Sequence, residues 1–248
     1  MPSQDPPHAT LLAFDTSTEQ LALGVLAQGR RWVDNRPGGA AASAALLPAL
    51  QALLQRAGQR LADVQAVAFG RGPGAFTGLR TSCAVAQGLA FGLNRPVLPI
   101  DSLLLVAEQA RQQAAAAAAD FDIGVVMDAR MGQAYAARYR WSGGRWQVLQ
   151  VPRLWPTDTL AADWAAQPPA ATAGSGLAVF DVALQLACPQ AGRIALGDDR
   201  AGALLALAAQ AWSDGVMLDA AEALPVYLRD KVAQTTEERA AARASVAG

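Results

Sequence analysis

The sequence has few of the residues that most catalytic and metal sites require. Its one histidine, His8, lies in a polar, proline-rich stretch near the start, and its two cysteines, Cys83 and Cys188, are far apart. These counts exclude a Ser-His-Asp triad, a zinc-protease motif with paired histidines and a cysteine-rich zinc site. A disulfide framework is excluded as well, and we expect a reducing, cytoplasmic environment.

The sequence also lacks a net charge of one sign and long apolar runs. Its 20 Lys and Arg residues balance 21 Asp and Glu residues, which leaves a formal net charge of −1. A protein that grips nucleic acid through many phosphate contacts is basic, so we do not expect this surface to bind nucleic acid by itself. We expect neither a signal peptide nor a membrane-spanning helix. The hydrophobic fraction of 52% excludes a disordered chain.

The 248 residues instead alternate between strand and helix patterns. Apolar runs at 10–15 and 20–27 flank a polar turn and predict a β-hairpin, which a third strand at 30–35 extends. Apolar spacing predicts a helix from Ser43 to residue 56, and a second helix from Thr77 or Thr81 to residue 93. A third is predicted from Ser102 through the alanine run to 119. Further strands are predicted at 64–69, 97–100, 121–128, 133–140 and 146–151, further helices at 158–166, 177–186 and 200–212, and an extended piece at 225–229.

One local pattern occurs twice, about half a chain length apart. Asp15 ends a strand and starts a hairpin, Asp128 does the same, and a glutamine follows each of them five residues later. The repeat predicts two similar α/β halves. We expect a first lobe at 10–101, to which a helix at about 199–213 returns, and a second lobe at 102–198. An extended segment is expected at 214–232, with disordered tails at 1–9 and 233–248.

The glycine-rich segment at 70–80 (GRGPGAFTGLR) has two interpretations. Free N–H groups before a helix suit an anion, but glycines also build tight strand-to-helix corners. The turn after Asp15 also has two interpretations, because its carboxylate and hydroxyls suit either a magnesium-phosphate group or an Asx turn. The candidate anion- or nucleotide-binding residues are Asp15, Thr16, Ser17, Thr18, Gly70, Arg71, Gly72, Gly74, Thr77, Gly78 and Arg80.

A stripe of small residues follows this segment. Ala84, Gly88 and Gly92 recur every four residues, on one face of the predicted helix. A glycine inside a helix costs about 1 kcal/mol relative to alanine, so a closely packed neighbour must offset the loss, either within the domain or on a partner. With three leucines of the preceding helix the stripe forms a candidate partner interface, and the same surface could pair with itself as a two-fold dimer. The leucines are Leu46, Leu50 and Leu53.

Six segments together resemble the bacterial TsaB family, over about residues 10–232. They are FDTST at 14–18, LLP at 46–48, GRGPGAFTGLR at 70–80, GLAFG at 88–92, DARMG at 128–132 and PVYLR at 225–229. The glycine-rich and DARMG segments are the most specific, whereas the DTST turn is common to the wider actin-like superfamily. The chain departs from the family at Ala42-Ser43, where the family often has His-Ser.

The resemblance implies an α/β chain with the two-lobed actin/Hsp70/sugar-kinase-like (ribonuclease-H-like) fold and duplicated mixed-sheet halves. It implies a cytoplasmic, non-catalytic subunit that supports the paralogue TsaD in forming threonylcarbamoyladenosine at position 37 of tRNAs reading ANN codons. TsaD and the ATPase TsaE would be its partners, and tRNA would be reached only through the complex. ATP and a divalent metal would belong to those partners, and this chain would have no cofactor, metal or catalytic residue of its own.

The alternative is an ATP-binding small-molecule kinase or ATPase of the same superfamily. Such an enzyme needs a carboxylate base and a second glycine-rich loop for adenosine. The nearest candidate for that loop is Gly174-Ser175-Gly176.

Overall fold

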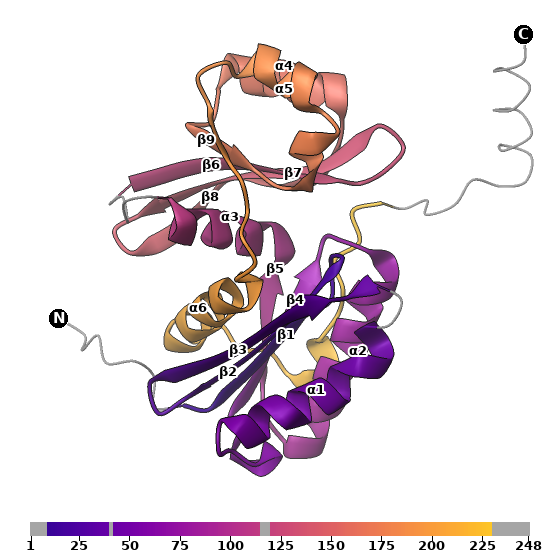
Figure 1. The fold of residues 1–248 in the computed structure, drawn as a ribbon, viewed down its shortest axis with the longest axis vertical. Coiled ribbons are helices and arrows are strands. Elements are labelled where there is room, and N and C mark those ends of the chain that lie inside the picture. Colours follow the sequence, from indigo (N-terminus) through magenta and orange to yellow (C-terminus); the bar gives the residue numbers. More distant parts are fainter. Residues whose placement is uncertain (1–8, 40–41, 115–119, 230–248) are drawn as a thin grey trace, which may run out of the picture.

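The computed structural model describes residues 9–39, 42–114 and 120–229 as two stacked α/β lobes (Figure 1). The first lobe holds a five-stranded sheet in the order β3-β2-β1-β4-β5, and the second holds one in the order β10-β9-β6-β7-β8. The strands of the first sheet are β1 (Leu11–Asp15), β2 (Gln20–Ala27), β3 (Arg30–Pro37), β4 (Ala66–Gly72) and β5 (Val97–Asp101). Those of the second are β6 (Asp120–Asp128), β7 (Gln133–Ser142), β8 (Arg145–Pro156), β9 (Ala171–Ala173) and β10 (Gly192–Ile194).

The two sheets have the same topology. In each, the first three strands form an antiparallel meander, and the last two add in parallel beside the first strand. β1 therefore corresponds to β6, and the glycine-rich segment after β4 corresponds to Gly174-Ser175-Gly176 after β9. The predicted α/β fold with duplicated mixed-sheet halves is confirmed.

Helices cover both faces of the first sheet. Leu12 and Phe14 of β1 face α1 (Ala42–Arg56) and α2 (Phe76–Leu93), whereas Leu11 and Ala13 face α6 (Arg200–Ser213). Because alternate side chains of a strand point to opposite faces, β1 is apolar along its whole length. The approach of α6 is close enough that a Cβ on Gly24 of β2 would collide with Leu205.

The second lobe is built in the same way around its own sheet. Helix α3 (Ser102–Gln113) packs against one face of that sheet and also against α6, so these two helices lie between the sheets (Figure 1). The opposite face carries α4 (Thr157–Ala166) and α5 (Asp181–Ala187). Short 3-10 turns at Leu61–Asp63, Ser175–Ala178 and Ala220–Glu222 complete the described structure.

Several predicted boundaries were wrong, for local reasons. Ser102 does not cap α3, because Asp101 accepts hydrogen bonds from the backbone N–H groups of Leu103 and Leu104. That helix ends at Gln113, and 115–119 lie outside the described residues. The helix predicted at 177–186 is divided between the 3-10 turn and α5. Strands β9 and β10 were missed, because three residues are too few to show a period.

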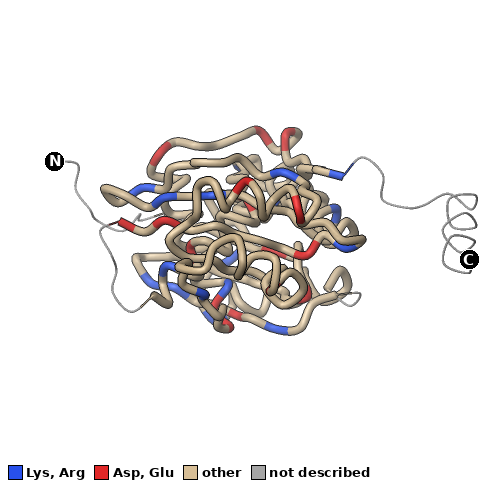
Figure 2. Tube along the Cα trace, turned by 90° about the horizontal axis from the view of Figure 1, so that it is seen from above, with Lys and Arg blue, Asp and Glu red and all other residues tan. Residues whose placement is uncertain are grey.

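Of the two tails predicted at the chain ends, the structure describes one residue. Of the tail expected at 1–9, Ala9 is described and is buried, whereas 1–8, which include His8, lie outside the described residues. The tail expected at 233–248 also lies outside them. No helix in the described part of the chain is long and apolar enough to cross a membrane. Positive and negative residues are interspersed along the traced chain (Figure 2).

Candidate functional site

Asp15 ends β1 at the floor of the cleft between the lobes, and an arginine neutralises it there. Nη2 of Arg200, in the first turn of α6, donates to Asp15 Oδ2 at 2.8 Å and to Ser17 Oγ at 3.3 Å. The backbone N–H of Ser17 donates to Asp15 Oδ1 at 2.5 Å, which forms an Asx turn. Asp15 and Arg200 are 0% and 3% exposed, so this is a buried ion pair.

The glycine-rich segment packs directly onto this turn. A Cβ on Gly70 would overlap the Asp15 carboxylate, one on Gly74 would overlap the carbonyl of Ser17, and one on Gly78 would overlap the carbonyl of Thr16. The glycines at these positions therefore allow two backbones to touch. Backbone and hydroxyl hydrogen bonds join the same pieces, from Ala75 N to Ser17 O at 2.8 Å and from Thr16 Oγ1 to Gly78 O at 2.6 Å.

The structure thus brings together Asp15, Thr16 and Ser17 with Gly70, Gly74 and Gly78, but as a packed corner. Each oxygen of the Asp15 carboxylate accepts a hydrogen bond from its own chain, and the side chain is buried, so this arrangement does not present it to a magnesium-phosphate group. The second candidate loop, Gly174-Ser175-Gly176, is also a packed corner, because a Cβ on either glycine would overlap Val126. Among residues 9–39, 42–114 and 120–229, no three His, Cys, Asp or Glu side chains gather where they could hold a metal ion.

The remaining predicted anion-site residues are placed differently. Thr18 lies on the cleft wall, and Thr77 is exposed in the first turn of α2, where its carbonyl accepts a hydrogen bond from Thr81. Gly72 has a φ of +106° and lies against Val226, while the carbonyl of Arg71 accepts from the backbone N–H of Val226 at 2.8 Å. Sequence order alone did not reveal that the segment at 225–229 reaches this place.

A strap formed by Pro225–Arg229 crosses the cleft from the first lobe to the second (Figure 1). In the first lobe, the Tyr227 ring lies 4.9 Å from the Phe76 ring and its hydroxyl accepts from Arg80 Nε at 3.1 Å. The Arg80 guanidinium in turn lies 3.9 Å from the centre of the Phe76 ring. In the second lobe, Arg229 Nη2 donates to the carbonyls of Ala129 and Arg130 at 2.9 and 3.2 Å.

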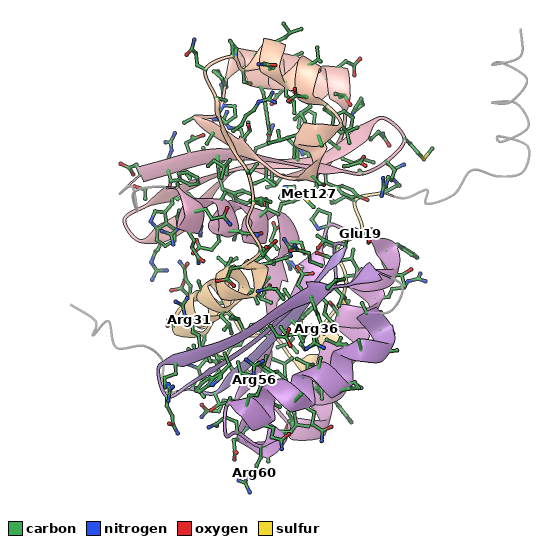
Figure 3. All side chains as sticks on the ribbon, in the orientation of Figure 1. Glu19, Arg31, Arg36, Arg56, Arg60 and Met127 are labelled. Carbon is green, nitrogen blue, oxygen red and sulfur yellow. The ribbon has the colours of Figure 1, made fainter. Side chains whose placement is uncertain are left out.

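The cleft beneath the strap has a volume of about 930 Å³. Its walls are mostly apolar, and Glu19 of the first lobe and Met127 of the second lie at its two edges (Figure 3). Phe76 and Tyr227 contribute aromatic surface, and Arg200 forms part of the floor. Asp15 is paired beneath this floor, and the carboxylates that line the cleft itself, Glu19 and Asp128, belong to different lobes.

The small-residue stripe on α2 faces away from the rest of the chain. Ala84, Gly88 and Gly92 are exposed, and no described atom lies within 4 Å of a Cβ placed on either glycine. The neighbouring Phe91 is 81% exposed, and Leu47 of α1 is 51% exposed. Apolar surface of this kind often marks a protein interface.

The three leucines predicted to belong to the same interface are buried instead, so that prediction was wrong. Leu46, Leu50 and Leu53 are 0%, 2% and 1% exposed and belong to the chain's own core. Their spacing marks the inner face of an amphipathic helix, and the outer face of α1 carries Leu47 instead. We define the α2 face as Ala84, Gly88, Phe91 and Gly92.

A second buried cluster joins the lobes behind the cleft. Tyr139 of β7 donates from its hydroxyl to Asp101 Oδ2 at 3.0 Å, while Asp101 caps α3. Burial raises the pKa of Asp101, although the hydrogen bonds from Leu103, Leu104 and Tyr139 act in the opposite direction. Burial also raises the pKa of Tyr139 well above its usual value.

Comparison with known proteins identifies the family. A family model described as "TsaD: tRNA N6-adenosine threonylcarbamoyltransferase" matches residues 37–184. The Escherichia coli protein named "tRNA threonylcarbamoyladenosine biosynthesis protein TsaB" is 30% identical over an alignment of 240 positions, which covers 90% of this chain and 96% of that protein. The chain belongs to the TsaB family. A Haemophilus influenzae protein of the same name is 40% identical over 126 residues, about half of each chain.

Solved structures agree with this membership of the TsaB family. A Pseudomonas aeruginosa structure titled "YeaZ from Pseudomonas aeruginosa" is 36% identical, with a TM-score of 0.76 over 89% of this chain and all of that one. A second Pseudomonas structure, titled as an uncharacterized protein with similarity to peptidase YeaZ, is 37% identical with a TM-score of 0.78 over the same shares. The recognition of the TsaB family from six segments is confirmed.

Three residues of the cleft were missed as site residues from the sequence, although each left a signal. Arg200 is the one charged residue of α6, a helix that is otherwise almost wholly apolar, and such a residue usually has a buried partner. Arg229 and Tyr227 belong to the PVYLR segment, whose part in joining the lobes could not be inferred from resemblance.

Proposed function

We propose that this chain is a non-catalytic subunit that binds a TsaD paralogue and supports it in forming threonylcarbamoyladenosine at position 37 of tRNAs reading ANN codons. The α2 face carries the proposal, because it is an exposed apolar helix face with space for a second backbone at Gly88 and Gly92. The names of the TsaB relatives and the match to the threonylcarbamoyltransferase family model support this role in tRNA modification.

The absence of catalysis by the chain alone is supported by the cleft. In an enzyme of this superfamily an aspartate after the first strand would face a metal-bound phosphate. Here the Asp15 carboxylate instead accepts hydrogen bonds from Arg200 and from the Ser17 N–H. Under this proposal ATP and a divalent metal belong to TsaD and to the ATPase TsaE. The tRNA is then reached through the complex, which is consistent with interspersed surface charge (Figure 2).

The α2 face suits the paralogue because two helices of small residues can approach backbone to backbone. A duplicated family would present an equivalent helix pair on the partner, so that two helices from each subunit form a four-helix interface. In the absence of that partner the same face pairs with itself as a two-fold dimer.

Gly88→Leu tests the interface. A leucine here adds bulk where the partner backbone is expected, and we expect association to weaken by ~1–3 kcal/mol through overpacking. Fold stability should hold or rise by up to about 1 kcal/mol, because leucine favours helix over glycine. Pull-down of purified TsaD and sedimentation of the chain alone measure association, and thermal melting measures the fold.

Ala165→Leu is the matched control, because it adds a leucine to the exposed surface of α4, on the other lobe. It should leave association and melting unchanged. The partner docks elsewhere if Gly88→Leu binds TsaD as tightly as Ala165→Leu does and supports as much tRNA modification in the reconstituted system.

A further inference from the structure

The two lobes are connected on both sides of the cleft, but in different ways. On one side the chain passes directly from β5 into α3, and α3 packs along α6. Gln109 and Gln113 of α3 add hydrogen bonds to the backbone of Gly197, just before α6. This side has a continuous apolar core and is suited to act as a hinge. On the other side, only the strap at 225–229 spans the mouth of the cleft among the described residues (Figure 1).

Each end of the strap is clasped by side chains. Tyr227 stacks on Phe76 and accepts from Arg80, and both of these residues lie in the first turns of α2. A backbone hydrogen bond from Val226 N to Arg71 O fixes the same end to β4. The first-lobe end is therefore held by one aromatic stack and two hydrogen bonds.

The second-lobe end is held by one arginine on an unusual turn. Arg130, Met131 and Gly132 have φ values of 65°, 57° and 67°, so three successive residues lie in the left-handed region. Two of them are not glycine, and that conformation is costly unless the surroundings enforce it. The Arg229 guanidinium bridges the carbonyls of Ala129 and Arg130 and thereby stabilises the turn.

We propose that the strap is a latch: its Tyr227 clasp and its Arg229 clasp together fix the spacing of the lobes, and release of either one lets the cleft open about the α3–α6 hinge. A few exposed, separable contacts hold the mouth, whereas a packed apolar core holds the hinge. Opening by loss of a clasp therefore costs much less than separating the lobes at the hinge. Since the first clasp is built on α2, any ligand of Phe76 or Arg80 would compete with Tyr227 and open the cleft.

The test measures the distance between lobes directly, in the full chain. Spin labels are placed on cysteines introduced at Gln55 of α1 and Ala165 of α4, both exposed positions on different lobes. Native Cys83 and Cys188 are buried, and burial raises the pKa of the Cys83 thiol to about 11, so the introduced thiols label first. Pulsed dipolar spectroscopy then gives the distribution of distances between the labels.

We expect a single narrow distribution for the parent chain. Arg229→Met and Tyr227→Ala, which release opposite ends, should each shift it to longer distances by more than its original width. Hydrogen exchange at the amides of Ala129 and Gln133 should speed up by about tenfold or more in Arg229→Met, the effect of losing a charge-assisted hydrogen bond. Arg153→Met removes an exposed arginine from the same lobe and should change neither measurement.

The two variants must agree for the proposal to hold. If circular dichroism shows both folded and either leaves the distribution unchanged, the strap is only a local brace and the latch is wrong. If either variant fails to fold, Arg229→Lys and Tyr227→Phe take their places, since each weakens its clasp without removing the side chain. Distances identical to the parent in either of these milder variants also overturn the proposal.

Discussion

At the scale of single residues, the ion pair of Asp15 and Arg200 neutralises a buried carboxylate beneath the floor of the cleft. Both groups are buried, and Arg200 Nε has no hydrogen-bond partner in the described structure. Removing one member of such a pair leaves the other charge buried and uncompensated. Arg200→Met should therefore lower the free energy of unfolding by about 3–5 kcal/mol, measured by urea denaturation.

The double variant Asp15→Asn/Arg200→Met checks the cause of that loss. It removes both charges, so it should be more stable than Arg200→Met alone. Arg153→Met, at an exposed position of β8, should change stability by less than ~0.5 kcal/mol. A double variant as unstable as the single one would show that the aliphatic part of Arg200, rather than charge pairing, supports the fold.

Asp101 gives a second prediction at this scale, for pH dependence. Burial raises its pKa, so the folded protein keeps this proton to a higher pH than the unfolded chain, whose aspartates titrate near ~3.9. The folded state thus binds more protons above that value, and the contribution of Asp101 to stability falls as pH rises from there through the raised pKa.

Asp101→Asn should remove this dependence while keeping a side chain that can cap α3. We expect the variant to gain stability relative to the parent chain as pH rises from about 4 to about 7. Urea midpoints measured for both proteins across that range give the comparison, and titration of other acids cancels in the difference. A difference that stays constant with pH would contradict the prediction.

At the scale of elements, the glycines of α2 have opposite roles. A Cβ at Gly78 would overlap the carbonyl of Thr16, which is backbone and cannot move aside, whereas a Cβ at Gly88 meets nothing within 4 Å. Gly78→Ala should therefore destabilise the fold by ~1–3 kcal/mol or more. Gly88→Ala, the same substitution in the same helix, should stabilise it by up to about 1 kcal/mol. Chemical denaturation of the two variants tests the contrast, which similar results in both would refute.

Elements with a strong local period were predictable from sequence, and those fixed by distant contacts were not. The hairpin of β1 and β2 and the helix α6 follow the predicted ranges closely, because alternation and helical spacing are properties of the segment itself. The packed corner at Gly70, Gly74 and Gly78 left two interpretations open, because what a glycine touches lies outside its own segment. The pairing of Arg200 with Asp15 joins positions 185 residues apart, and no local pattern encodes it.

At the scale of the whole molecule, the first lobe depends on a helix from the far end of the chain. Helix α6 covers one face of the first sheet, where Leu204, Leu205 and Leu207 pack with Leu11 of β1 and Leu98 of β5. The five strands and two helices encoded before residue 102 thus leave one apolar face of their sheet without its covering helix. The duplicated topology hides this dependence, because sequence order alone divides the chain neatly into halves.

A chain that ends at Gly197 tests that dependence, since it keeps both sheets and loses α6 together with the 3-10 turn at Ala220–Glu222 and the strap. Exposing a continuous apolar sheet face should make it aggregate or remain unfolded, because burial of that face supplies much of the stability of the lobe. A chain that ends at Arg229 is the control: it retains α6, the strap and all contacts named above, and should melt as the full chain does. Size-exclusion chromatography and circular dichroism compare the two. A soluble, monomeric and folded chain ending at Gly197 would mean that the first lobe is stable with one sheet face bare, and α6 would then serve only to hold Arg200 over Asp15.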